Sequence, residues 1–261
     1  MSSRRLLVPV DGGHVAADVA GRDEDPTVLL LPGQSLGPDV CAGLAADLAP
    51  AFRTAVVHTR GTGASQAEPG PWTTALFAAD AVAVLDALGL ERAHVHGFSM
   101  GGRVATVLAA HHPGRVDRLV LAASGPGGPH EVARDPQVDR TLRFSSSPQG
   151  RDGLLDLFFT PAWSAAHPDV ARRFLPTGSP RVRRAHHAAS TGHDGWDLLA
   201  RISAPTLVLH GADDAMTPVA NAELLAGRVP GAHLHVLPGA RHGYLEEFRP
   251  AASGLVAAFL S

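Results

Sequence analysis

The sequence predicts an α/β fold in which a mostly parallel, largely eight-stranded twisted sheet is flanked by helices and carries one inserted helical segment. Short apolar runs, each closed by Gly or Pro, alternate along the chain with Ala- and Leu-rich stretches of helical length. This alternation is interrupted between residues 125 and 199, where no strand pattern is found. We therefore expect an α/β core formed by residues 1–124 and 200–261, and a helical cap formed by residues 125–199.

The expected elements follow one another in a regular order. Residues 6–10 and 15–20 surround the turn sequence Asp-Gly-Gly and predict an antiparallel hairpin at the edge of the sheet. Further strands are expected at residues 27–33, 54–61, 93–98, 118–124, 205–211 and 232–239. Helices are expected between them at residues 39–49, 74–89, 100–112 and 221–229. Parallel pairing is favoured because each helix returns the chain across the sheet before the next strand begins.

The composition indicates a globular protein and argues against several classes of function. The chain has 261 residues, of which 45% are hydrophobic and 18% charged, so it can bury a large core. A net charge of −3 leaves no basic surplus for binding nucleic acid. The single cysteine, Cys41, excludes an intrachain disulfide and a cysteine-based zinc site.

The apolar runs also argue against a targeting segment. The run before Asp11 is too short for a signal peptide, and no run approaches the ~18 apolar residues of a membrane span. We therefore expect a cytoplasmic protein with no membrane partner.

Residues 97–101, Gly-Phe-Ser-Met-Gly, place one serine between two glycines where an expected strand meets an expected helix. A serine hydroxyl is a poor nucleophile near neutral pH unless a base removes its proton and a third group orients that base. The pattern Gly-x-Ser-x-Gly at a strand-to-helix turn exposes such a serine, with glycines where side chains would crowd the turn. Ser99 is therefore a candidate nucleophile. The alternative is that Ser99 only caps a helix or forms a turn. A base and an acid later in the chain would favour the nucleophile instead.

Candidate partners for Ser99 do follow later in the chain. Asp213 and Asp214 come directly after one expected strand, and His242 comes after the last one. The carboxyl ends of parallel strands meet at one edge of the sheet, so these side chains can lie together there. The order serine, acid, histidine is also the order found in enzymes with this turn. Either aspartate could supply the acid on this evidence.

Five segments of the chain resemble the α/β-hydrolase family: LLLPGQS, HTRGTGAS, HGFSMGG, PTLVLHGADDAMTP and PGARHGYLEEF. Together they cover both expected parts of the core. The resemblance implies that Ser99 is the nucleophile and His242 the base. Family members carry the acid in the pattern Gly-x-x-Asp-x-x-x-Pro, which implies Asp214, followed by Pro218, in preference to Asp213.

The same resemblance implies an oxyanion hole made of two backbone N–H groups, those of Gln34 and Met100. This chain has Pro-Gly before Gln34 where many relatives have His-Gly, a change that a backbone donor tolerates. His58 stands where relatives often carry Asp, at the start of HTRGTGAS. We interpret that motif as structural, with Arg60 bridging loops.

Four aromatic residues of the expected cap are candidates for lining a substrate pocket: Phe144, Phe158, Phe159 and Trp163. They are equally good candidates for the cap's own core. Residues 35–40 and 157–174 are similar to the 3-oxoadipate enol-lactonase group. That similarity implies a small carboxylic ester or lactone as the substrate.

The 15 histidines raise the question of a metal site. The pairs His111–His112 and His186–His187 are adjacent, so their side chains diverge on a helix, whereas ligands converge at a spacing of four residues. We expect neither a metal nor another cofactor.

The sequence therefore predicts a serine hydrolase that cleaves a small carboxylic ester or lactone through an acyl-enzyme, with a small-molecule ester, lactone or thioester as its partner. The same fold could instead carry a carbon–carbon bond hydrolase, a cofactor-free perhydrolase, or an enzyme that releases or cyclises a thioester. Assays with diketones or of peracid formation distinguish the first two from an esterase. A non-catalytic ligand-binding protein is the alternative of a different class, and the complete set of candidate catalytic residues argues against it.

Overall fold

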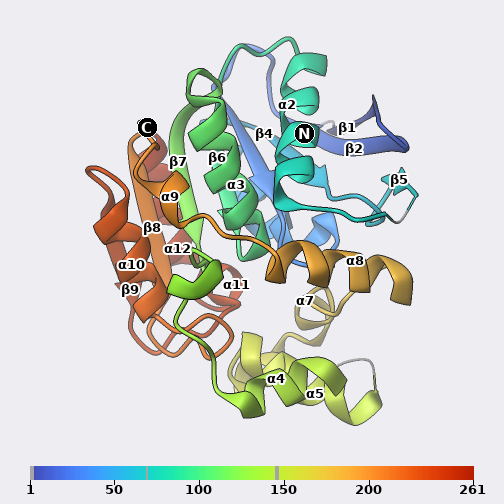
Figure 1. Cartoon of the computed structure of the whole chain (residues 1–261), viewed down its shortest axis with the longest axis vertical. Coiled ribbons are helices and arrows are strands. Elements are labelled where there is room, and N and C mark those ends of the chain that lie inside the picture. The colour runs from blue at the N-terminus through green and yellow to red at the C-terminus, as the bar shows by residue number, and fades with distance from the viewer. Residues whose placement is uncertain (1–2, 69, 145–146) are drawn as a thin grey trace.

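The computed structural model describes residues 3–68, 70–144 and 147–261, and its centre is one mixed sheet (Figure 1). The strand order is β1-β2-β4-β3-β6-β7-β8-β9, and the two-residue strand β5 pairs with β2 outside this path. The strands are β1 Ser3–Val10, β2 Gly13–Ala20, β3 Thr27–Leu31, β4 Arg53–His58, β5 Gln66–Ala67, β6 Ala93–Phe98, β7 Val116–Ala122, β8 Thr206–Gly211 and β9 His233–Leu237. The predicted fold class is confirmed, and β5 is an addition to it.

The N-terminal hairpin and the parallel core are joined within this sheet. β1 pairs antiparallel with β2, and Val10 lies opposite Gly13, so Asp11 and Gly12 form the predicted turn. β2 pairs antiparallel with β4, whereas β4, β3, β6, β7, β8 and β9 pair parallel in that order. The carboxyl ends of these six strands therefore lie at one edge of the sheet.

Helices cover both faces of the sheet. Leu29 and Leu31 of β3 belong to one apolar cluster, and Val28 and Leu30 belong to another. Because successive side chains of a strand point to opposite faces, the two clusters lie on opposite sides of the sheet. Helices α2 Thr74–Ala87, α3 Met100–His111 and α10 Ala220–Arg228 contribute to the first cluster. Helices α1 Ala42–Leu48, α11 Tyr244–Glu247 and α12 Arg249–Leu260 contribute to the second.

Residues 125–199, which we call the inserted segment, connect β7 to β8. Its helices are α4 Pro136–Phe144, α5 Pro148–Phe158, α6 Pro161–Ala166, α7 Pro168–Arg172, α8 Pro180–Thr191 and α9 Trp196–Leu199. A short 3-10 turn, Gly128–His130, lies near the start of this segment. Two others, Pro38–Cys41 and Pro113–Arg115, lie in the core. Figure 1 shows α4 and α5 at the lower end of the molecule, below the sheet. None of the helices in the described ranges has both the length and the apolar character needed to cross a membrane.

The side chain of Arg60 bridges loops, as predicted. Its Nε and Nη2 donate to the two carboxylate oxygens of Asp80 on α2, at 2.6 and 2.7 Å. Its Nη1 donates to the carbonyl of Asp11 in the hairpin turn at 2.7 Å. The buried ion pair thus ties the hairpin and α2 to the loop that follows β4.

His96 is a buried histidine in the middle of the sheet. It lies on β6 and is only 1% exposed, and neither ring nitrogen forms a hydrogen bond with the described residues. Burial without a partner disfavours the charged imidazolium, which lowers the pKa of His96 to about 4. The ring therefore stays neutral in the folded protein at a pH where the same residue in the unfolded chain is protonated.

We predict that His96→Leu reduces the loss of stability in mild acid. As the pH falls from ~6.5 toward about 4, the unfolded chain binds a proton at His96 that the folded chain does not, and at pH 5 this favours unfolding by about 2 kcal/mol. Urea unfolding at pH 8 and pH 5 measures the difference in unfolding free energy. That difference should be about 2 kcal/mol smaller in His96→Leu. His112→Leu, at an exposed position, serves as the control. Equal differences in the two variants would contradict the prediction.

Candidate active site

The chain turns sharply at Ser99, between β6 and α3. Ser99 has φ 56° and ψ −118°, a positive φ that is uncommon for a residue with a side chain. A Cβ on Gly97 would lie 2.3 Å from the carbonyl oxygen of Gly101, and a Cβ on Gly101 would lie 2.0 Å from the carbonyl oxygen of Leu31. The N–H of Ser99 donates to the carbonyl of Ala122 on β7 at 2.8 Å. Packing that leaves no room for a side chain on either glycine therefore holds the turn in its strained conformation.

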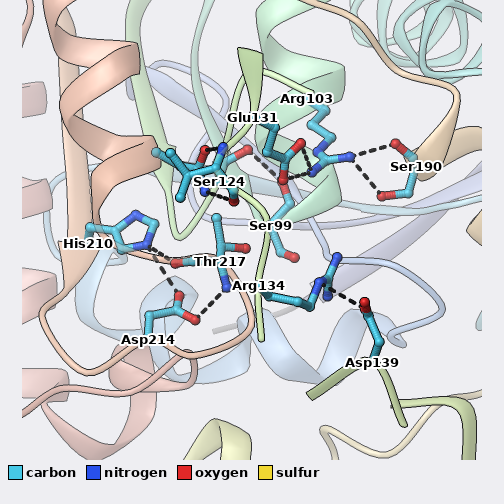
Figure 2. Close-up of polar contacts among 12 residues, drawn as sticks. Ser99, Arg103, Ser124, Glu131, Arg134, Asp139, Ser190, His210, Asp214 and Thr217 are labelled. Carbon is cyan, nitrogen blue, oxygen red and sulfur yellow. Dashed lines mark hydrogen bonds and ion pairs between the residues drawn. The ribbon is translucent and has the colours of Figure 1, made fainter. Parts of the chain in front are cut away.

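A second serine supports this turn from the segment that follows β7. The hydroxyl of Ser124 donates to the carbonyl of Ser99 at 2.9 Å, as Figure 2 shows. A Cβ on Gly102 would lie 2.5 Å from the Cβ of Ser124, so a third glycine allows this close approach. Ser99 itself is half-buried, which leaves its side chain accessible.

Asp214 and His242 are brought together by the loops after β8 and β9. Nδ1 of His242 lies 2.6 Å from Oδ2 of Asp214, and both side chains are buried. Because a carboxylate only accepts hydrogen bonds, Nδ1 carries the proton. The N–H of Thr217 donates to Oδ1 of Asp214 at 2.8 Å, and Nε2 of His210 lies 3.4 Å from Oδ2 (Figure 2). Asp213 is exposed, so the structure brings Asp214, and not its neighbour, to His242.

The surroundings of Asp214 keep its carboxyl group ionised. Burial by itself raises the pKa of Asp214, but attraction to the protonated form of His242 and hydrogen bonds from His210 and His242 outweigh it. The pKa of Asp214 consequently lies well below its usual range. An ionised Asp214 holds a proton on Nδ1 of His242, so a further proton accepted by the ring goes to Nε2. The sequence analysis did not identify His210 or Thr217, whose only signal is their closeness to Asp214 in the chain.

The imidazole of His242 lies next to the turn at Ser99. Its ring packs against Phe98, the residue before Ser99, with ring centroids 5.1 Å apart. Among the hydrogen bonds of the described residues, none joins the hydroxyl of Ser99 to His242. Such bonds are often long in sites without substrate and shorten when substrate binds. The structure therefore gathers the three candidate residues at one edge of the sheet and joins two of them directly.

The two candidate oxyanion donors lie on segments that flank Ser99. A Cβ on Gly33 would lie 3.3 Å from the Cβ of Ser99, so the loop after β3 passes directly beside this residue. Gln34 is the next residue of that loop. Met100 is the first residue of α3, and the first N–H groups of a helix have no acceptor within the helix. The role of both N–H groups as oxyanion donors stays a prediction.

The four aromatic candidates in the inserted segment occupy different environments. Phe158 packs against the ring of His242, with centroids 5.5 Å apart. Phe159 is fully buried and stacks on Trp163 at 4.5 Å. Phe144, at the end of α4, is 62% exposed. Phe158 thus contacts a candidate catalytic residue, whereas Phe159 and Trp163 pack on each other and Phe144 is largely exposed.

The histidines of the described ranges do not converge on a metal ion. His186 is fully buried and its neighbour His187 is exposed, so this pair diverges. His111 and His112 are both exposed. Over the residues that the structure describes, no group of three or more His, Cys, Asp or Glu side chains is arranged to hold a metal.

Arg103 joins the helix that begins after Ser99 to the inserted segment. Its Nη2 donates to both carboxylate oxygens of Glu131 at 2.6 and 2.7 Å, and its Nη1 donates to the carbonyl of Ser190 at 2.6 Å (Figure 2). Burial lowers the pKa of Arg103 from its usual value, and the charge of Glu131 opposes that shift. These partners lie 28 and 87 positions away in the chain, and no local pattern indicated them.

Comparison with known proteins gives consistent matches. The sequence model of the alpha/beta hydrolase fold family matches residues 26–248. The chain is 31% identical over 265 residues, 97% of each chain, to a protein of Caulobacter sp. strain K31 assigned as the carbamate hydrolase RutD. It is 30% identical over 233 residues to the pimeloyl-[acyl-carrier protein] methyl ester esterase of Chromobacterium violaceum, covering 84% of this chain and 88% of the other. It also matches the enol-lactonase structure from Burkholderia xenovorans LB400, with a TM-score of 0.84 and 26% identity over 98% of this chain and 99% of that one.

We predict that Glu131→Gln destabilises the fold by about 2–4 kcal/mol, because it leaves the buried charge of Arg103 without its partner. Urea unfolding measures this loss. Asp25→Asn removes one half of a surface ion pair with Arg22 and serves as the control, for which no measurable change is expected. Effects of the same size in both variants would show that the Arg103–Glu131 pair contributes no more than a surface pair.

Proposed function

The chain belongs to the alpha/beta hydrolase fold family and is a hydrolytic enzyme, and on that premise we propose that it cleaves a small carboxylic ester or lactone through an acyl-enzyme on Ser99. The observation that carries this proposal is the 2.6 Å contact between His242 Nδ1 and Asp214 Oδ2 beside the strained turn at Ser99. The names of the esterase and enol-lactonase relatives support the substrate class.

In the proposed reaction, Nε2 of His242 removes the proton of the Ser99 hydroxyl as its oxygen attacks the substrate carbonyl carbon. The imidazole then carries a positive charge, which the ionised carboxylate of Asp214 stabilises through Nδ1–H. The low pKa of Asp214 supports this assignment, because a protonated carboxyl would lose that attraction. The mechanism thus uses the tautomer that the site already holds.

The tetrahedral intermediate places a negative charge on the former carbonyl oxygen. We assign its stabilisation to the backbone N–H groups of Gln34 and Met100, which lie on the segments that flank Ser99. Collapse of the intermediate expels the alcohol, which takes the proton from Nε2 of His242 and leaves an acyl group on Ser99. A water molecule activated by the same nitrogen then releases the acid.

The inserted segment is proposed to act as a cap that covers this reaction. Phe158, at the end of α5, contacts His242, and this contact supports the proposal that it lines the substrate pocket. The N–H of Gly243 donates to the carbonyl of Phe158 at 2.7 Å, which connects the cap to the loop of the catalytic histidine. Phe159 and Trp163 are proposed to support Phe158 from within the cap.

Carbamates are a second candidate substrate class. They are favoured by the similarity to the Caulobacter protein assigned as a carbamate hydrolase, which extends over 97% of both chains. A carbamate carbonyl would be attacked by Ser99 in the same way, with nitrogen in place of carbon on one side of the reacting carbonyl. Testing both classes together separates them.

We predict that the enzyme hydrolyses members of one class in a panel of short and long acyl esters, lactones, thioesters and carbamates followed by pH-stat. Ser99→Ala should lower kcat by about 10³-fold or more, because it removes the nucleophile. Hydrolysis of a carbamate only, measured as released ammonia or amine because that base offsets the acid formed, would select the second candidate. If no member is cleaved, or if Ser99→Ala cleaves as fast as the wild type, the proposed function is wrong and a ligand-binding role becomes the better explanation.

A matched pair of variants tests the acid. Asp214→Asn should lower kcat by about 10⁴-fold, because an amide neither stabilises the imidazolium nor holds the proton on Nδ1 of His242. Asp213→Asn changes the adjacent, exposed carboxylate and should retain wild-type kcat. Kinetics on the best substrate of the panel measure both. Comparable losses in the two variants would argue against Asp214 as the acid.

A further inference from the structure

The loop after β3 contains a residue whose backbone is strained. Ser35 has φ 57°, is 3% exposed, and directly follows Gln34. A residue with a side chain adopts such a φ only when its surroundings hold it there. The loop's own contribution is a turn in which the N–H of Leu36 donates to the carbonyl of Gly33 at 3.2 Å. Among the described residues, the hydrogen-bond partners of the Ser35 N–H and carbonyl are His186 and Thr177 of the inserted segment.

Two residues of the inserted segment bind the two peptide units that meet at the Cα of Ser35. The N–H of Ser35 donates to Nδ1 of His186 on α8 at 3.0 Å. The carbonyl of Ser35 accepts hydrogen bonds from the N–H and the hydroxyl of Thr177, at 2.7 and 3.2 Å. The N–H and the carbonyl of Ser35 therefore both form hydrogen bonds with residues more than 140 positions away in the chain.

His186 is itself fixed in one orientation and one tautomer. Because the N–H of Ser35 donates to Nδ1, that nitrogen carries no proton, and Nε2 must donate to the carbonyl of Arg60, 2.8 Å away. The imidazole is fully buried, with ring centroids 5.5 Å from Trp72 and 5.4 Å from Phe77. Burial lowers the pKa of His186, which keeps the ring neutral. A charged ring would lose the acceptor that Ser35 needs.

The strained residue lies beside the reaction centre. Gly33 approaches Ser99 so closely that an added Cβ would lie 3.3 Å from the Cβ of the serine. Gln34, the proposed oxyanion donor, lies between Gly33 and Ser35. The N–H of Ser35 belongs to the peptide unit that starts at the Cα of Gln34, so its bond to His186 restricts the backbone directly after the proposed oxyanion donor.

We propose that His186 is a positioning residue of the oxyanion hole: it reaches from the inserted segment to the backbone of Ser35 and thereby aims the N–H of Gln34 at the developing oxyanion. This inference rests on the proposed function. His186 touches neither the substrate nor Ser99 in this role. It also links the inserted segment to catalysis, since a displaced α8 would release the oxyanion loop.

The test compares His186→Leu with His186→Asn. Leucine fills a similar volume but offers no acceptor, whereas Oδ1 of asparagine can take the place of Nδ1 and accept the N–H of Ser35. In His186→Leu we expect kcat to fall at least about tenfold with KM changed less than about threefold, because an oxyanion donor acts in the transition state. The inhibition constant of a boronic acid that forms a tetrahedral adduct with serine should rise by the same factor. His186→Asn should recover most of both, and His187→Leu, the exposed neighbour, should match the wild type.

The outcomes separate positioning from packing. Wild-type kcat in His186→Leu, or equal losses in the leucine and asparagine variants, would overturn the proposal. Should His186→Leu fail to fold, nitrogen-15 NMR of the wild type decides: a neutral ring protonated at Nε2 from pH 6 to 8 is expected, and a ring protonated at Nδ1 would overturn it. A wild type that hydrolyses nothing on the substrate panel refutes the proposed function instead, while the NMR result still decides whether His186 holds Ser35.

Discussion

At Ser99 the chain passes from β6 into α3 at a φ of 56°, a conformation that a serine keeps only under constraint from its neighbours. The constraint has two parts. Gly97 and Gly101 let β6, α3 and the end of β3 approach to distances that no side chain would permit. The carbonyl of Ala122 fixes the N–H of Ser99 from β7. The other parts of the candidate site lie around this turn, because the proposed nucleophile has to stand where the loops after β3, β8 and β9 meet.

The parallel sheet explains why those loops meet. Strands that run in one direction deliver their carboxyl ends to a common edge, so residues far apart in the chain become neighbours there. Asp214 and His242 arrive from two adjacent strands and form the 2.6 Å contact. The cost of burying the carboxylate is offset by the N–H of Thr217 and the imidazoles of His210 and His242, which keep it ionised.

The inserted segment is joined to the candidate site at three points, by an ion pair, a main-chain hydrogen bond and a hydrogen bond to a histidine side chain. An ion pair joins Glu131 to Arg103 on the helix after the serine. Main-chain contact joins Phe158 to the loop of His242 through Gly243. A neutral histidine, His186, holds the loop of the proposed oxyanion donor. The helices of the inserted segment are consequently attached to the core beside the proposed reaction. A change in their position would therefore displace the helix after Ser99, the loop of His242 and the loop of Gln34 together.

The sequence by itself determined what depends on local pattern. Buried strands appear in the sequence as continuous apolar runs because helices cover both faces of the sheet, so the positions of the strands in the chain and their mostly parallel pairing could be predicted. The turn at Ser99 carries its own glycines, and the resemblance to the family pattern that ends at Pro218 implied Asp214 in preference to Asp213.

Only the tertiary structure decided how the inserted segment meets this core. Its helices are short and separated by prolines, so the periodicity of their apolar residues does not show which face of each helix packs on the core. Phe144 and Phe158 looked equivalent in the sequence, yet one is 62% exposed and the other packs on His242. The bond from Ser35 to His186 spans 151 positions, and such a contact depends on the packing of whole elements, for which no local sequence signal exists.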